Sequence, residues 1–422
     1  MQDIRIGFRE SILGNDKECL VHCADNLAQF TRAVGHISSK SDRSLACAAE
    51  DDIVVLDHPL DTEYQAWLRS LSLGTDHVVV YESHPAGKTV SELIVNDPAP
   101  VLAMIKETGK QPVYLPWYSG PWENKAAGVI GADLFGASAS LTVQYNEKSL
   151  FKQLCRELGI PVVEDTCFRM GSGSHQNLET LQGIVAGYLS DHPRVLARAA
   201  MDNTGVSMAY VTDGADLEAL YGKWRELGID KLIIEPFLTV RHSPCGQWIV
   251  TREKEIVDTG MVNQMLSDLW HQGSIKTDTI PEFDWEPVQS VTLKLAQHMA
   301  ASGYIGFVGI DFIETDSGVF PVENNARLNG SSYVKLIVER IEALSGPVSC
   351  WKSLKAKTSP CSFQQFIRKT DAVLYDGKKS RGYFPYNCEK LGKTGDFALI
   401  LMGPDLEAIA DLEGEINRLG VF

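Results

Sequence analysis

The segment from residue 306 to residue 332 gathers side chains that could bind a metal ion. It reads GFVGIDFIETDSGVFPVENNARLNGSS. Asp311 lies before a glycine-containing turn, and Glu323 and Asn325 follow that turn on alternate positions. Two carboxylates and an amide oxygen are hard ligands, of the kind that hold Mg²⁺ together with the phosphate groups of a substrate. The segment therefore predicts a divalent metal site with Asp311, Glu323 and Asn325 as its ligands.

The spacing within this segment predicts a β-hairpin that brings the ligands to one face. A three-residue loop, Asp316-Ser317-Gly318, would place its glycine in the left-handed position that such loops require. That loop pairs Thr315 with Val319, and counting outward places Asp311 opposite Glu323. A two-residue loop would shift the register by one residue and separate the two carboxylates.

Arg327 and the Gly-Ser-Ser run after it add groups that bind phosphate. An arginine and backbone amides beside a metal ion can hold a transferring phosphoryl group or stabilise an oxyanion. An isolated Asp–Glu pair is more often part of an ordinary solvated hairpin. Here the polar run E-N-N-A-R directly follows an apolar strand, which favours a functional site over a solvated hairpin. We take Arg327 and Ser331 as the candidate catalytic residues.

Composition limits the class of protein. A chain of 422 residues predicts two or three domains, and 44% hydrophobic with 22% charged residues is typical of globular proteins. The net charge of -16 argues against nucleic-acid binding as the main function. Nine cysteines without a CxxC pair, and an N-terminus without an apolar signal segment, predict a reduced cytoplasmic protein that does not enter a membrane.

Periodicity divides the chain into three parts, of class α/β and α+β. Residues 1–145 alternate apolar strands with helices, which predicts a parallel α/β domain. In residues 146–358 the pattern begins with the helix NEKSLFKQLCRELG, with Asn146 as its expected N-cap, and continues with α+β elements. Residues 359–422 predict a small α+β cap that ends in a helix.

The order of these segments resembles the ATP-grasp superfamily. The strand G-I-D-F, the hairpin and the run E-N-N-A-R match its pattern G-x-D-[FV] followed by E-x-N-x-R. The resemblance covers about residues 146–358 and implies a nucleotide-binding subdomain, 146–235, and a metal-binding subdomain, 236–358. The preceding α/β domain and the tail containing RGYFPYN and FALILMG are similar to those of pheganomycin-type peptide ligases with a pre-ATP-grasp domain.

The resemblance also implies a nucleotide site. Lys148 and Arg198 would hold the phosphates of ATP, and the strand IIEPFL would grip adenine through the side chain of Glu235 and the backbone of the residues after it. The nucleotide-binding residues that it implies are Lys148, Arg198, Gly205, Glu235, Phe237 and Leu238. A lysine is usual where Arg198 stands, and the loop 202–205 is poor in glycine. Taken alone, Lys148 and Arg198 are more often surface cations, and IIEPFL is as often plain core.

The function implied is that of an ATP-dependent carboxylate–amine ligase acting through an acyl phosphate. Its cofactors would be ATP and Mg²⁺, with Mn²⁺ left open, and its substrates small carboxylates and amines such as amino acids or short peptides. Residues 260–274 are a candidate wall or lid that excludes water, with plain packing equally open. The alternative functions are a ligase with a thiol or other acceptor, and a protein that binds ATP without turnover. A homodimer is left open as the oligomeric state.

Overall fold

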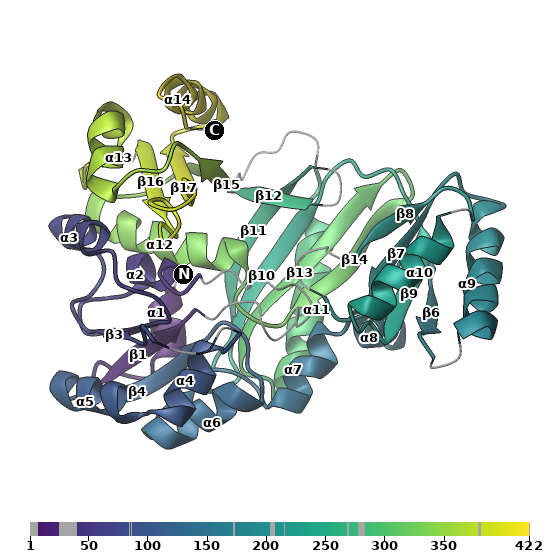
Figure 1. The fold of residues 1–422 in the computed structure, drawn as a ribbon, viewed down its shortest axis with the longest axis horizontal. Coiled ribbons are helices and arrows are strands. Elements are labelled where there is room, and N and C mark those ends of the chain that lie inside the picture. Colours follow the sequence, from purple (N-terminus) through teal and green to yellow (C-terminus); the bar gives the residue numbers. More distant parts are fainter. Residues whose placement is uncertain are drawn as a thin grey trace.

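The described residues form three sheets: an N-terminal sheet, a central sheet and a peripheral sheet, which Figure 1 shows beside one another. The computed structural model describes residues 7–24, 40–83, 85, 87–171, 174–202, 207–214, 216–267, 270–276, 283–378 and 381–421. Gly205, predicted to bind the nucleotide, lies outside the described residues. In the part of the chain described here, no helix is long and apolar enough to cross a membrane.

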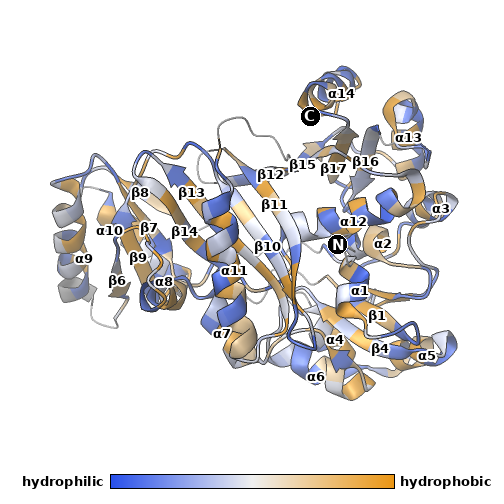
Figure 2. Ribbon diagram, turned by 180° about the vertical axis from the view of Figure 1, so that it is seen from behind, coloured by the Kyte–Doolittle hydropathy of each residue, from blue (hydrophilic) through white to orange (hydrophobic). Residues whose placement is uncertain are grey.

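The N-terminal sheet has five parallel strands. Their order is β3 (Val78–Val80), β2 (Ile53–Leu56), β1 (Glu18–Cys23), β4 (Gln111–Pro116) and β5 (Asp133–Leu134). The helices of this part are α1 (Phe8–Ile12), α2 (Arg43–Cys47), α3 (Thr62–Ser70), α4 (Val90–Asn96), α5 (Ala99–Thr108) and α6 (Pro121–Ile130). Strands β1 and β2 are buried along their whole length, as expected of a parallel sheet between layers of helices. Figure 2 shows the hydrophobic residues of β1 and β4. The parallel α/β architecture predicted for this part is confirmed.

The peripheral sheet has four antiparallel strands and two helices. Their order is β6 (Thr166–Arg169), β9 (Lys231–Pro236), β7 (Val195–Ala199) and β8 (Ala209–Val211), with α9 (Ser174–Leu189) and α10 (Leu217–Glu226) packed beside them. Two helices, α7 (Ala139–Asn146) and α8 (Lys148–Glu157), join it to the N-terminal sheet. The N-cap of α8 is Glu147, which accepts a hydrogen bond from the amide of Leu150. The prediction that Asn146 caps this helix is wrong, because Asn146 ends α7 and donates its amide to the carbonyl oxygens of Thr142 and Ala326.

The central sheet has eight antiparallel strands. Their order is β14 (Gly318–Asn325), β13 (Gly306–Thr315), β10 (Pro244–Val250), β11 (Ile256–Ser267), β12 (Trp270–Lys276), β15 (Cys350–Lys357), β17 (Asp396–Gly403) and β16 (Gly382–Tyr386). Its helices are α11 (Glu286–Ala301), α12 (Gly330–Ser345), α13 (Phe363–Thr370) and α14 (Leu406–Arg418), and a 3₁₀ helix spans Asp371–Val373. The sheet runs without a break from the hairpin β13–β14 into the C-terminal strands, so it is continuous across residue 358.

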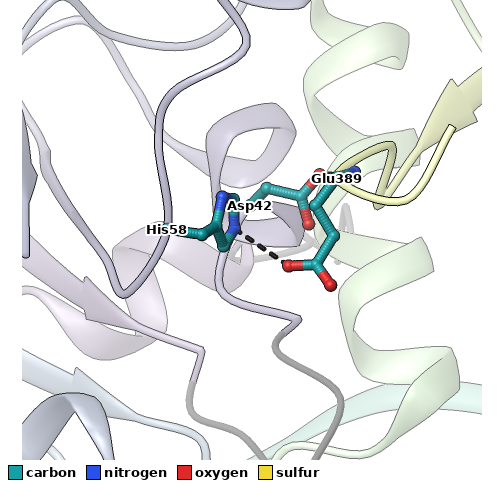
Figure 3. A group of neighbouring side chains, drawn as sticks. All are labelled: Asp42, His58 and Glu389. Atoms are coloured by element: carbon teal, nitrogen blue, oxygen red, sulfur yellow. Dashed lines mark hydrogen bonds and ion pairs between the residues drawn. The ribbon is translucent and has the colours of Figure 1, made fainter. Parts of the chain in front are cut away.

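The N-terminal part is joined to the C-terminal strands by polar as well as apolar contacts. Asp42, directly before α2, accepts a hydrogen bond of 3.0 Å from the amide of Glu389. The Nε2 atom of His58 lies 3.1 Å from the carboxylate of Glu389 (Figure 3). The ring of Trp67 packs 5.4 Å from that of Phe363. The Glu389 contacts hold the start of α2 against the segment that follows β16, and the Trp67–Phe363 contact holds α3 against α13.

Candidate functional site

The predicted pairing of Asp311 with Glu323 is present in the hairpin β13–β14. The three-residue loop that was expected to produce this pairing is absent from the hairpin. Thr315 pairs with Gly318, so the loop has two residues and should have separated the carboxylates. A β-bulge between Asp311 and Phe312 shifts the register back by one residue. The predicted three-residue loop is therefore wrong, and the bulge is what places the two acids opposite each other.

Asp311 is the centre of a cluster of oxygen-bearing side chains. Its two carboxylate oxygens accept hydrogen bonds of 2.6 Å from Gln264 and 2.8 Å from Asn325. Burial, and then the negative charge of Glu323, raise the pKa of Asp311 to about 7. Two carboxylates held together away from water repel each other, and a divalent cation between them relieves that repulsion. The donor set of two carboxylates and an amide fits a hard cation such as Mg²⁺.

Lys148 reaches this cluster from the opposite side. It is the first residue of α8, and its ammonium lies 3.2 Å from the carboxylate of Glu323 and 2.8 Å from the carbonyl oxygen of Asp202. Its side chain is almost completely buried. The structure therefore brings a cation of the peripheral part against the carboxylates of the central sheet.

A second cation, Arg198 on β7, also bridges the two parts. Its guanidinium lies 2.8 Å from the carboxylate of Glu235 and donates a hydrogen bond of 3.1 Å to the carbonyl oxygen of Val322. Val322 is the residue that the bulge leaves without a partner in β13. The same irregularity thus aligns the two acids and supplies a carbonyl group for Arg198.

Sequence reasoning missed Lys152. This lysine is fully buried, and its ammonium lies 2.5 Å from the carboxylate of Glu235 and 3.2 Å from that of Asp165. Both oxygens of Glu235 are therefore engaged by cations, one by Lys152 and one by Arg198. The position of Lys152 in the sequence could have identified it, because it follows Lys148 by one helical turn and shares its face of α8.

One cleft of about 890 Å³ contains most of these groups, with Lys152 and Asp165 outside its lining. It is lined by every predicted site residue that the structure describes, namely Lys148, Arg198, Glu235, Phe237, Leu238, Asp311, Glu323, Asn325, Arg327 and Ser331. We call the part around Asp311, Glu323, Lys148 and Arg198 the carboxylate end. The hairpin β11–β12, within the predicted wall 260–274, contributes Gln264 and other residues to the lining.

The strand β9 leads into a part of the cleft suited to a flat ring. The ring of Phe237 packs edge-on against that of Tyr210 at 4.8 Å, and the guanidinium of Arg194 lies 4.3 Å from the Phe237 ring. Leu238 lines the cleft, and its amide donates no hydrogen bond to another described residue. An apolar wall with an adjacent unpaired amide is a common way to hold a heterocycle.

Comparison with known proteins gives a match at the level of structure only. No family model matches the sequence, and no curated protein matches it either. The fold is similar to biotin carboxylase from Campylobacter jejuni in complex with β,γ-ATP, with a TM-score of 0.62 and 15% identity, over 96% of this chain and 92% of that chain. It is also similar to N5-carboxyaminoimidazole ribonucleotide synthetase from Thermus thermophilus, with a TM-score of 0.57 and 14% identity, over 96% and 98% of the two chains.

This chain has the ATP-grasp fold. A third similar structure is the biotin carboxylase domain dimer of 2-oxoglutarate carboxylase from Hydrogenobacter thermophilus with MgADP, ADP and bicarbonate, with a TM-score of 0.58 and 13% identity, over 94% and 88% of the two chains. The similarity extends beyond the segment that carried the sequence resemblance, into the N-terminal and C-terminal parts. The predicted ATP-grasp architecture is confirmed, and the narrower similarity to pheganomycin-type ligases stays a prediction.

Within the ATP-grasp fold, Arg327 and Ser331 lie where β14 leads into α12. The guanidinium of Arg327 is buried 5.1 Å from the ring of Trp117, a residue of the N-terminal part. Burial lowers the pKa of Arg327, whereas the carboxylates of Glu323 and Asp311 favour its charged form. Arg327 thus connects the hairpin β13–β14 to the N-terminal part.

The amides at the start of α12 are only partly open. Asn329 caps the helix and accepts a hydrogen bond of 2.9 Å from the amide of Ser332. The hydroxyl of Ser331 donates to Asn329 at 2.9 Å and accepts from Gln247. The expectation that the whole run offers free amides is therefore wrong for Ser332. The amides of Gly330 and Ser331 are in the first turn, where no intrahelical acceptor exists.

A second group of cleft residues was not anticipated from the sequence. We call it the α12 end, and four residues from three parts of the chain line it: Lys40, Arg43, His271 and Lys355. Lys40 and Arg43 precede and begin α2, His271 is on β12 and Lys355 is on β15. No motif marks these residues, because their proximity depends on how the N-terminal and central sheets pack together.

Proposed function

We propose that this chain is an ATP-dependent carboxylate–amine ligase that activates a carboxylate as an acyl phosphate. The observation that carries the proposal is the contact of 3.2 Å between Lys148 and Glu323 across the cleft, beside Asp311 and Asn325. Phosphoryl transfer needs phosphate-binding cations opposed to metal-binding oxygens in one enclosed site. The carboxylate end has both.

ATP and Mg²⁺ are the proposed cofactors, with Mn²⁺ as the alternative metal ion. The similar structures support this choice, since one is a complex with β,γ-ATP and another contains MgADP. Asp311, Glu323 and Asn325 would hold the metal ion. When bound, the ion would neutralise charge on the phosphates of ATP.

Lys148 and Arg198 would bind the phosphates from the side of the peripheral sheet. Their ion pairs with Glu323 and Glu235 keep both cations in place before the nucleotide arrives. A guanidinium delivers its charge as a planar fork, so Arg198 can contact a phosphate and keep its bond to Val322. An arginine therefore suits this position, although a lysine is usual there.

Adenine would lie against Phe237 and Tyr210. The amide of Leu238 would donate a hydrogen bond to the edge of the ring. Because both oxygens of Glu235 already bind cations, we assign its carboxylate the role of holding Arg198 and Lys152. The amino group of adenine would then bind a backbone carbonyl of this segment rather than the Glu235 side chain.

The second half of the reaction would take place beside Arg327. The γ-phosphoryl passes to the substrate carboxylate and ADP remains; the amine then attacks the carbonyl, loses a proton and displaces phosphate. Arg327 and the amides of Gly330 and Ser331 would stabilise the oxyanion of the tetrahedral intermediate. The hairpin β11–β12 walls the cleft on this side and would limit hydrolysis of the acyl phosphate.

The test is a hydroxylamine trap in the presence of ATP, Mg²⁺ and pooled amino acids and short peptides. Hydroxylamine captures an acyl phosphate as a hydroxamate whatever the natural acceptor is, and ADP release is measured in parallel. A hydroxamate that disappears in the Asp311→Asn variant supports the proposal. Hydroxamate without an amide product from any amine points to a thiol or another acceptor. ATP binding without substrate-stimulated ADP points to a protein that binds ATP without turnover.

A further inference from the structure

Arg43 is a buried cation that forms no ion pair with another described residue. Its side chain is 7% exposed, and two of its guanidinium nitrogens, Nε and Nη2, are buried without a hydrogen-bond partner. The contact that supports its charge is the face of the Tyr333 ring, whose centroid lies 3.9 Å from the guanidinium carbon. A buried charge that lacks hydrogen bonds costs free energy, so its retention points to a ligand that supplies them.

Two lysines face the same part of the cleft. The ammonium of Lys40 has no ion pair among the described residues, and that of Lys355 binds only the carbonyl oxygen of His271, at 2.9 Å. Burial, followed by the charges of Arg43 and Lys355, lowers the pKa of Lys40 to about 8. Burial, followed by Lys355 and Lys40, lowers the pKa of His271 to about 4. The charges of Lys40, Arg43 and Lys355 therefore repel one another, and His271 is neutral at pH 7 beside them.

No carboxylate of the described cleft lining lies among these cations. The acids that line the cleft are Asp202, Glu235, Asp311 and Glu323, and all four have partners at the carboxylate end. Outside the lining, the carboxylate of Glu389 favours the charged form of Lys40, but it faces His58 at 3.1 Å (Figure 3). The chain has a net charge of -16, so a group of cations without acids between them points to a functional role for these cations.

The start of α12 adds amide donors to this group. The Cε1 atom of His271 lies 3.7 Å from the position that a Cβ atom would occupy on Gly330. His271, whose carbonyl oxygen binds Lys355, therefore adjoins the first turn of a sixteen-residue helix. Helix N-termini attract anions through their unpaired amides and their positive dipole end.

We propose that Lys40, Arg43 and Lys355 bind an anionic group of the substrate, a carboxylate or a phosphate that is distinct from the carboxylate activated by ATP. The proposal rests on the function proposed above, because it places the substrate between the two ends of the cleft. The substrate is accordingly a small molecule with a second negative charge, such as a dicarboxylate or a phosphorylated acid.

The experiment measures anion binding to the full chain by calorimetry, with ADP and Mg²⁺ present at saturation so that the carboxylate end is filled. The probes are inorganic phosphate, succinate and the neutral compound succinamide. The variants are Lys355→Gln, Lys40→Gln and Arg43→Gln. The matched control is Lys357→Gln, since Lys357 lies two residues along β15 and pairs with Asp396 at 3.4 Å, away from the cleft.

Phosphate or succinate should bind and succinamide should not, and each cleft variant should weaken binding about tenfold while Lys357→Gln changes nothing. The tighter of the two anions identifies the phosphate or the carboxylate as the group recognised. Anion binding that is unchanged in all three cleft variants overturns the proposal, as does the absence of anion binding in a protein that binds an ATP analogue. Failure to bind the ATP analogue would instead overturn the proposed function. Lys355 is exposed, so its variant stays informative if Arg43→Gln does not fold.

Discussion

The two ends of the cleft handle charge in opposite ways. At the carboxylate end, Lys148 pairs with Glu323 at 3.2 Å and Arg198 with Glu235 at 2.8 Å, and Lys152 pairs with the same Glu235 from behind the lining. At the α12 end, Lys40, Arg43 and Lys355 have no acid as a partner among the described residues of the lining. Both groups line the same cleft.

This difference teaches how each end depends on its ligand. Paired charges hold their geometry without a ligand, so the carboxylate end is preorganised and loses little order when a nucleotide binds. Unpaired cations are under mutual repulsion until an anion arrives, so the α12 end gains stability from binding. The four predictions below test this contrast, beginning with the largest expected effect.

Lys152→Met should destabilise the protein by about 3–5 kcal/mol, because it leaves the buried carboxylates of Glu235 and Asp165 without their shared cation. Thermal and denaturant unfolding measure the change. The control is Arg156→Met, since Arg156 pairs with the same Asp165 from the surface and should matter by less than about 1 kcal/mol. Equal effects of the two variants would show that burial of the network contributes nothing.

Arg327→Gln should lower kcat by about 100- to 1,000-fold while the affinity for an ATP analogue stays within about threefold, because a preorganised donor acts mainly in the transition state. Steady-state ADP release measures kcat, and calorimetry measures the affinity for the ATP analogue. A variant that loses nucleotide affinity and keeps kcat would place Arg327 with the phosphates of ATP and not with the acyl group.

Arg198→Lys should weaken ATP binding about tenfold, although a lysine is usual at this position in the superfamily that the sequence resembles. A lysine cannot contact Glu235 and the carbonyl oxygen of Val322 together and still face a phosphate in the same fork geometry. Calorimetry with an ATP analogue measures the change. An affinity equal to that of the unmodified protein would mean that the bond to Val322 has no part in nucleotide binding.

Lys40→Gln should stabilise the protein without ligand at neutral pH, by up to about 1 kcal/mol. The folded state disfavours the charged form of Lys40, whose pKa is lowered to about 8 chiefly by burial. This penalty is fully present below pH 8 and is lost as the pH rises from there toward the ordinary lysine pKa of about 10.4. The advantage of the variant should therefore shrink between pH 8 and pH 10. Unfolding curves across this range check it, and an advantage that grows with pH would contradict the unpaired state of Lys40.

The sequence by itself predicted the fold and named the residues whose chemistry we propose at the carboxylate end. Asp311, Glu323, Asn325 and Arg327 lie within a single hairpin and its exit, where spacing along the chain decides which side chains meet. Even there the predicted cause of the pairing was wrong, because the loop is shorter and a bulge in β14 compensates for it. No residue type in this strand predicts a bulge.

Only the tertiary structure decided the rest. Lys152 reads as one more polar residue of an amphipathic helix until β9 packs against α8 and brings Glu235 to it. Lys40 and Arg43 lie more than three hundred residues before Lys355, and the three meet because α2, β15 and the start of α12 pack around one cleft. Local spacing predicts contacts within an element or a hairpin, whereas contacts between domains depend on packing, which a single sequence does not encode in any short motif.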